Sequence, residues 1–65
     1  MSVVKVIEII SEGKTVEAAV EASVAQATKS VRNVRSVNVK NIQARVVDGK
    51  VSEYRVICKV SFVVE

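Results

Sequence analysis

The sequence has no histidine and no tryptophan, and it has one cysteine in 65 residues. A single cysteine cannot form a disulfide within the chain. Without histidine, the chain lacks the usual ligand set of a tetrahedral zinc site and the base that most often activates a nucleophile. The seven carboxylates show no metal-loop spacing. We therefore predict neither a metal site nor an enzyme.

The small size of the chain limits the core that it can build. We expect one domain, residues 1–65, near the lower limit at which a single core holds a chain together. Because disulfides and structural metals are disfavoured here, oligomerisation is the expected source of extra stability. The 49% hydrophobic content is mostly valine and alanine, with Tyr54 and Phe62 as the only aromatic residues. This composition favours small interlocking surfaces.

The N-terminal region shows no targeting signal and no membrane span. Its apolar stretch, residues 3–10, contains Lys5 and Glu8 and is far too short to cross a bilayer. We expect a cytoplasmic protein with no membrane partner. The formal charge of +3 favours anionic partners only mildly, because it is also an ordinary surface charge for a soluble protein.

The first half of the chain predicts a strand and a helix. Residues 3–10 are rich in β-branched side chains, which is typical of a strand, and residues 11–14 with Gly13 are expected to break it. Thr15 is the predicted N-cap of a helix. The predicted buried positions of this helix recur at helical spacing and are Val16, Ala19, Val20, Ser23, Val24, Ala27 and Val31.

The second half predicts a long β-hairpin. Residues 36–47 form the first strand, Asp48-Gly49 is a strong turn signal, and residues 50–65 return. In the returning strand the even-numbered residues, which include both aromatic residues, are expected to cover the helix. The first strand changes phase, from odd-numbered Val37 and Val39 to even-numbered Ile42. Either a bulge lies near Asn41, or the distal half buries its opposite face.

Element lengths and directions predict an α+β fold, β-α-β-β, with a three-stranded antiparallel sheet of order 1-3-2 wrapped around one helix. One helix cannot cover strands of this length. Apolar residues that it is not expected to reach are Ile42, Val51, Ile57 and Val63. Because an uncovered apolar sheet favours aggregation, we expect a closed homo-oligomer.

Three other motifs give weak functional signals. The stretch "EGKT" lies between a strand and a helix, but Glu8 stands where a phosphate-binding loop needs glycine, so only a weak anion site at the helix N-terminus with Lys14 remains. Cys58 is in phase with Val56 and Val60 and is predicted to be buried and structural. Basic residues are spread through the C-terminal half, but both aromatic residues fall on the predicted core face, which disfavours nucleic-acid binding.

Several segments, in order and spacing, resemble the dodecins: "KVIEII", "VEAAVEASVAQATKSVRNVR", "VVDGKVSEYRV" and "KVSFVVE". Dodecins are small flavin-binding proteins that assemble as hollow spheres of twelve subunits. The resemblance covers nearly the whole chain. It implies a homododecamer that binds a flavin, such as FMN, FAD or riboflavin.

The resemblance also implies where such a ligand lies. Dodecins typically place a flavin-stacking tryptophan directly after the "RNVR"-like segment, where this chain has Ser36. A flavin-bonding glutamine typically follows the tyrosine of the last strand, where this chain has Arg55. The implied ligand-binding residues are therefore Ser36, Val37, Asn38 and Arg55. The charge of Arg55 would favour an anionic ligand.

Two functions follow from these observations. The first is storage or sequestration of a flavin, or of another flat or anionic ligand, with flavin binding weakened by the two replacements. The second is a structural or interaction shell whose pocket has decayed and holds no flavin.

Overall fold

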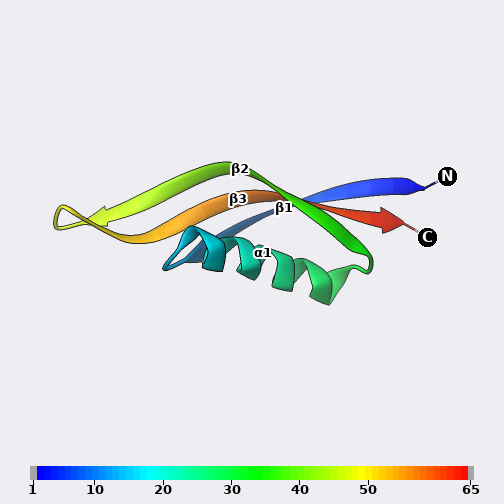
Figure 1. Cartoon of the computed structure of the whole chain (residues 1–65), viewed down its shortest axis with the longest axis horizontal. Helices are drawn as coiled ribbons and strands as arrows, with labels where there is room; N and C mark the ends of the chain where they lie inside the picture. Colours follow the sequence, from blue (N-terminus) through cyan, green and yellow to red (C-terminus); the bar gives the residue numbers. More distant parts are fainter. Residues whose placement is uncertain (1, 65) are drawn as a thin grey trace.

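The computed structural model describes residues 2–64 and has the predicted element order. β1 (Val3–Gly13) is followed by α1 (Val16–Ser30), β2 (Val34–Val47) and β3 (Lys50–Val64), as Figure 1 shows. The sheet is antiparallel with the order β1-β3-β2. The predicted fold class and strand order are therefore confirmed. The chain is elongated, with principal extents of 51 × 19 × 13 Å.

The junction between β1 and α1 is tighter than predicted. Ser11, Glu12 and Gly13 continue the strand, so the expected break at residues 11–14 is wrong for these three. A Cβ on Gly13 would lie 2.7 Å from the backbone nitrogen of Ala19, closer than real Cβ contacts come. The glycine therefore serves the close approach of β1 to the first turns of the helix.

Thr15 caps α1 as predicted, because its Oγ1 accepts a hydrogen bond from the backbone nitrogen of Ala18 at 3.0 Å. The helix face that meets the sheet has small side chains, with Ala19, Ser23 and Ala27 fully buried. Small residues let helix and sheet approach closely. The helix within residues 2–64 lacks the length and apolar character needed to cross a bilayer.

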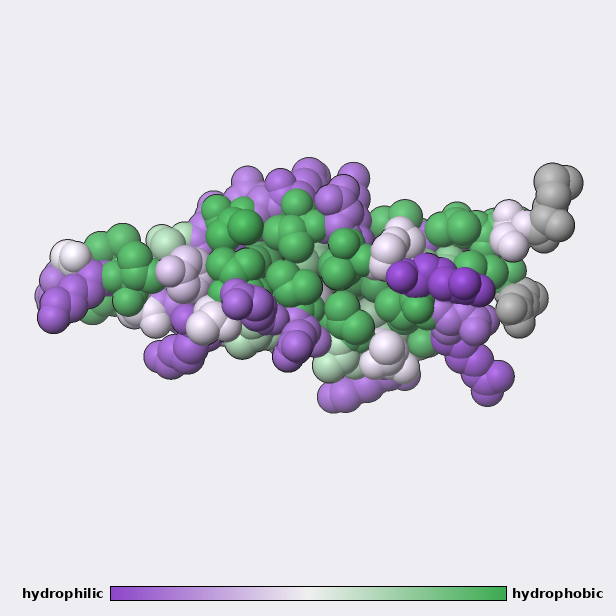
Figure 2. Space-filling model, in the orientation of Figure 1, coloured by the Kyte–Doolittle hydropathy of each residue, from purple (hydrophilic) through white to green (hydrophobic). Residues whose placement is uncertain are grey.

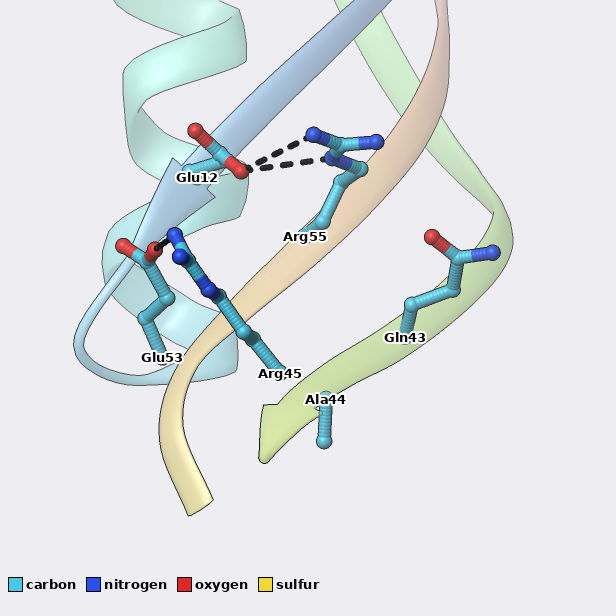
Figure 3. Close-up of a pocket in the computed structure, with 6 residues that line it drawn as sticks. All are labelled: Glu12, Gln43, Ala44, Arg45, Glu53 and Arg55. Atoms are coloured by element: carbon cyan, nitrogen blue, oxygen red, sulfur yellow. Dashed lines mark hydrogen bonds and ion pairs between the residues drawn. The ribbon is translucent and has the colours of Figure 1, made fainter. Parts of the chain in front are cut away.

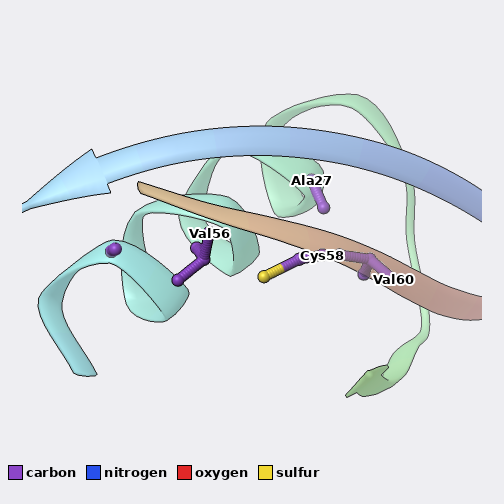
Figure 4. Close-up of a cluster of buried hydrophobic side chains, with 5 residues drawn as sticks. Ala27, Val56, Cys58 and Val60 are labelled. Atoms are coloured by element: carbon purple, nitrogen blue, oxygen red, sulfur yellow. The ribbon is translucent and has the colours of Figure 1, made fainter. Parts of the chain in front are cut away.

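The core lies between α1 and the central strand. The even-numbered residues Val56, Cys58 and Val60 of β3 are fully buried against Ala19 and Ala27, and Figure 4 shows this cluster between strand and helix. The predicted core face of β3 and the burial of Cys58 are confirmed. The outer strands add half-buried side chains around this core, namely Ile7, Ile9, Val34, Val37 and Val39.

A β-bulge resolves the phase change in β2. Val39 lies opposite Cys58 and Asn41 lies opposite Ile57, so β2 advances two residues against one of β3 and Lys40 is the extra residue. Ile42 then lies opposite Val56, on the same sheet face as Val39. The bulge predicted near Asn41 is thus confirmed. Beyond it, the apolar residues of β2 remain on the sheet face that is turned toward α1.

The hairpin turn has the geometry that its sequence predicts. Asp48 and Gly49 both have left-handed φ values, 53° and 75°, as a tight two-residue turn requires. The hairpin extends beyond the N-terminal end of α1 (Figure 1), which leaves large apolar side chains exposed, among them Ile42, Val46 and Val51. Figure 2 shows hydrophobic residues in a band along the long axis of the molecule, bordered by hydrophilic ones. An apolar band of this extent is typical of a surface that meets another protein.

Candidate ligand site on the open sheet face

The candidate site lies on the sheet face turned away from α1, which we call the open face. Because Val56, Cys58 and Val60 face the helix, the alternate residues of β3 face away from it. The register extends this face to residues of β1 and β2 that lie opposite those positions. The polar residues of the open face include Glu8, Glu12, Ser36, Asn38, Gln43, Arg55 and Lys59.

Three of the four predicted ligand-binding residues lie on the open face. Ser36 is opposite Ser61, Asn38 is opposite Lys59, and both are exposed. Val37 is opposite the buried Val60 and packs against the core, so it lies on the helix side. Within one chain, Val37 does not share a surface with the other three.

Ser36 and Arg55 are far apart within one chain. Arg55 lies six residues along β3 from Ser61, the partner of Ser36, which is about 20 Å at about 3.3 Å per residue. Both side chains lie on the open face, but a single small ligand cannot contact both of them within one chain. A site that uses Ser36 together with Arg55 therefore requires a second chain.

Arg55 is held by an acidic partner on β1. Its Nε and Nη2 both donate to Oε2 of Glu12, at 3.3 and 3.2 Å. Two further cross-strand ion pairs occur among residues 2–64: Arg45 Nη1 lies 3.3 Å from Glu53 Oε1, and Lys40 Nζ lies 3.6 Å from Glu8 Oε2. Three of the basic residues considered for nucleic-acid binding thus have a carboxylate beside them, which argues further against a basic binding surface.

A shallow hollow of about 260 Å³ surrounds these ion pairs. It is lined by Glu12, Gln43, Ala44, Arg45, Glu53 and Arg55, which come from all three strands, as Figure 3 shows. Sequence reasoning found only Arg55 among these residues. The missed residues become neighbours of Arg55 through the strand register, which places Glu12 and Gln43 on either side of it.

A second hollow, of about 280 Å³, lies where α1 ends. It is lined by Val31, Arg32, Asn33, Phe62, Val63 and Val64, and none of the predicted ligand-binding residues lies in it. Asn33 has a left-handed φ of 60°, and its carbonyl oxygen accepts a hydrogen bond from the backbone nitrogen of Val63 at 3.1 Å. This hydrogen bond ties the connection between helix and β2 to the central strand. We assign it a structural role.

The described residues show no grouping of three or more metal-ligating side chains. The fold and the open face instead define a small α+β protein whose exposed sheet surface suits contact with a partner or a ligand. The sequence profile described as Dodecin matches residues 3–65, and the chain belongs to the dodecin family.

Solved structures agree with this membership. A variant of the dodecin from Thermus thermophilus is 32% identical, with a TM-score of 0.91 over 100% of this chain and 98% of that chain. The dodecin from Streptomyces coelicolor is 25% identical, with a TM-score of 0.89 over 98% of this chain and 93% of that chain. The dodecin from Streptomyces davaonensis, at 20% identity and a TM-score of 0.88, shares the fold. A search of curated protein sequences gives no match.

Proposed function

We propose that the chain assembles as a dodecin-like homododecamer that binds and stores a flavin in pockets between subunits, without enzymatic activity and in the cytoplasm. The observation that carries this proposal is the placement of Ser36 and Arg55 on the same open face but about 20 Å apart, at about 3.3 Å per residue. Only a neighbouring chain brings these positions to one ligand. Membership in the dodecin family supports a flavin as that ligand.

We expect the affinity for flavin to be low for a protein of this family. The chain has no tryptophan, whereas one solved variant of the Thermus thermophilus dodecin has a tryptophan replaced by phenylalanine. A stacking aromatic ring contributes about 1–3 kcal/mol by analogy with base stacking, or about 5- to 150-fold in affinity. Ser36 has no ring and contributes none of this. The ligand must therefore be held by hydrogen bonds and apolar contacts.

The second candidate function is a structural shell that holds no flavin. It is favoured by Ser36 and by the engagement of Arg55 with Glu12, which occupies the guanidinium with an internal partner. Both functions use the same assembly. They differ in whether the open face holds a ligand between subunits.

Native mass spectrometry of the purified protein tests both functions together. We expect a particle of about twelve times the 7.0 kDa chain mass, and bound flavin at low occupancy after incubation with riboflavin. The dodecamer with no flavin at saturating concentration supports the structural shell. A monomer or dimer at micromolar concentration rejects both functions, because the pocket between subunits would not exist.

A further inference from the structure

The hollow around Arg55 contains a polar group that has no hydrogen-bond partner among residues 2–64. Gln43 lies opposite Arg55 in the strand register and lines the same hollow. Among residues 2–64, no side chain or backbone group forms a hydrogen bond with its amide. Figure 3 shows this amide on the same side of the sheet as Arg55 and apart from the ion pairs.

The charged groups beside Gln43 are already matched to one another. Arg55 is paired with Glu12, and Arg45 is paired with Glu53, so two positive and two negative groups line the hollow. An anionic ligand would have to share a guanidinium with its carboxylate partner and would lie beside that carboxylate. The pairing therefore opposes the preference for anions that the charge of Arg55 alone suggests.

A neutral ligand meets no such obstacle. A glutamine amide offers two N–H donors and one carbonyl acceptor, side by side. This set matches the edge of a neutral heterocycle that alternates carbonyl acceptors with an N–H donor. Such an edge can bond to Gln43 while both ion pairs stay intact.

We infer that Gln43 determines ligand specificity in this hollow, by hydrogen-bonding the neutral, imide-like edge of a flat heterocycle. The inference rests on the proposed function, because the flavin ring has an edge of this kind. Gln43 recognises the ring of the ligand, and a ligand phosphate makes no contribution to binding in this hollow. Riboflavin and FMN, which share the ring and differ by the phosphate, are therefore expected to bind alike.

Titration of the assembled protein with riboflavin and with FMN, followed by flavin fluorescence, tests the inference. Gln43→Ala should weaken the binding of both flavins by about 5- to 30-fold, since one or two hydrogen bonds of about 1 kcal/mol each are lost. Gln26→Ala is the matched control, because Gln26 is exposed on α1, away from the hollow. It should leave both affinities unchanged.

Gln43→Glu provides a second test that keeps the side-chain shape. It removes the N–H donors, and it should weaken the binding of both flavins at least as much as Gln43→Ala. If the wild type binds flavin and neither variant changes its affinity, the inference about Gln43 is overturned while the proposed function stands. The inference is also overturned if FMN binds more than about tenfold tighter than riboflavin. A wild type that binds neither flavin overturns the proposed function and the inference with it.

Discussion

The guanidinium of Arg55 on β3 donates from both Nε and Nη2 to the same carboxylate oxygen of Glu12 on β1, at 3.3 and 3.2 Å. This contact joins the central strand to an edge strand on the open face. It also places a negative charge beside one of the predicted ligand-binding residues. We therefore regard Arg55 as one half of an ion pair and not as a free cation.

Removal of the acidic partner should restore the preference of Arg55 for anions. In Glu12→Gln we expect FMN to bind about 3- to 10-fold tighter relative to riboflavin than in the wild type, because the guanidinium can then contact the phosphate. The ratio of the two dissociation constants is the measurement. Glu8→Gln is the control, since it removes the carboxylate beside Lys40 on the same face. An equal change of the ratio in both variants would show a general charge effect.

The two serine hydroxyls between β1 and α1 are expected to act as a pair. Ser23 is fully buried, and its Oγ lies 2.6 Å from that of Ser11. Ser11→Ala leaves the Ser23 hydroxyl buried without this partner and should lower the free energy of unfolding by about 1–3 kcal/mol. The double variant Ser11→Ala/Ser23→Ala should recover most of this loss.

Urea unfolding at fixed protein concentration measures this double-mutant cycle. Ser30→Ala, at an exposed position at the end of α1, is the control and should change little. Additive effects of the two single substitutions would contradict the pairing.

Gly13 is expected to tolerate no side chain. In Gly13→Ala the new Cβ would contact the backbone nitrogen of Ala19, which cannot move aside without shifting the helix. We expect a loss of about 1–3 kcal/mol of stability, as for an overpacked core site. Gly49→Asn is the contrast, because the space around Gly49 is open and asparagine tolerates a left-handed φ such as its 75° better than other side chains, so only a small loss is expected. Thermal unfolding should show a clearly lower Tm for Gly13→Ala than for Gly49→Asn.

Cys58 should react slowly with thiol reagents in the native protein. Cys58 lies on β3, and its side chain is fully buried against α1. A reagent dissolved in water therefore cannot reach the thiol. Labelling followed by mass spectrometry should be slow in buffer and fast in denaturant. Rapid labelling of the native assembly would show that the helix leaves the central strand readily.

The elements that have strong local signals were predictable from the sequence. Thr15 and the Asp48-Gly49 turn each have one dominant local structure, and the alternation in β3 identified its buried face. The bulge at Lys40 was predictable because it shifts the phase of apolar residues. A second irregularity lies between Arg45 and Val46, whose partners are Glu53 and Val51, so Ser52 is the extra residue.

The bulge at Ser52 is marked by a single apolar residue, Val51, which is odd-numbered whereas Tyr54 and Val56 are even-numbered. Counting back from a regular two-residue turn places Gln43 opposite Tyr54, whereas the structure places it opposite Arg55. The hollow around Arg55 therefore could not be assembled from the sequence. The irregularity between Val34 and Ser36 lies outside the predicted strand, because the second strand begins at Val34 and not at the predicted position 36.

The double variant Ser36→Trp/Arg55→Gln tests the central claim that an intersubunit flavin site is kept but weakened. The tryptophan adds a stacking ring, and the glutamine restores an amide in place of a charge. Ser30→Trp controls for an added ring elsewhere, because Ser30 is exposed at the end of α1.

The measurement is the quenching of riboflavin fluorescence on titration with assembled protein. We predict weak binding by the wild type, unchanged binding by Ser30→Trp, and about 5- to 150-fold tighter binding by the double variant, which is the contribution of one stacked ring. A double variant that assembles and gains no affinity, or a wild type that already binds at nanomolar concentration, would contradict the claim.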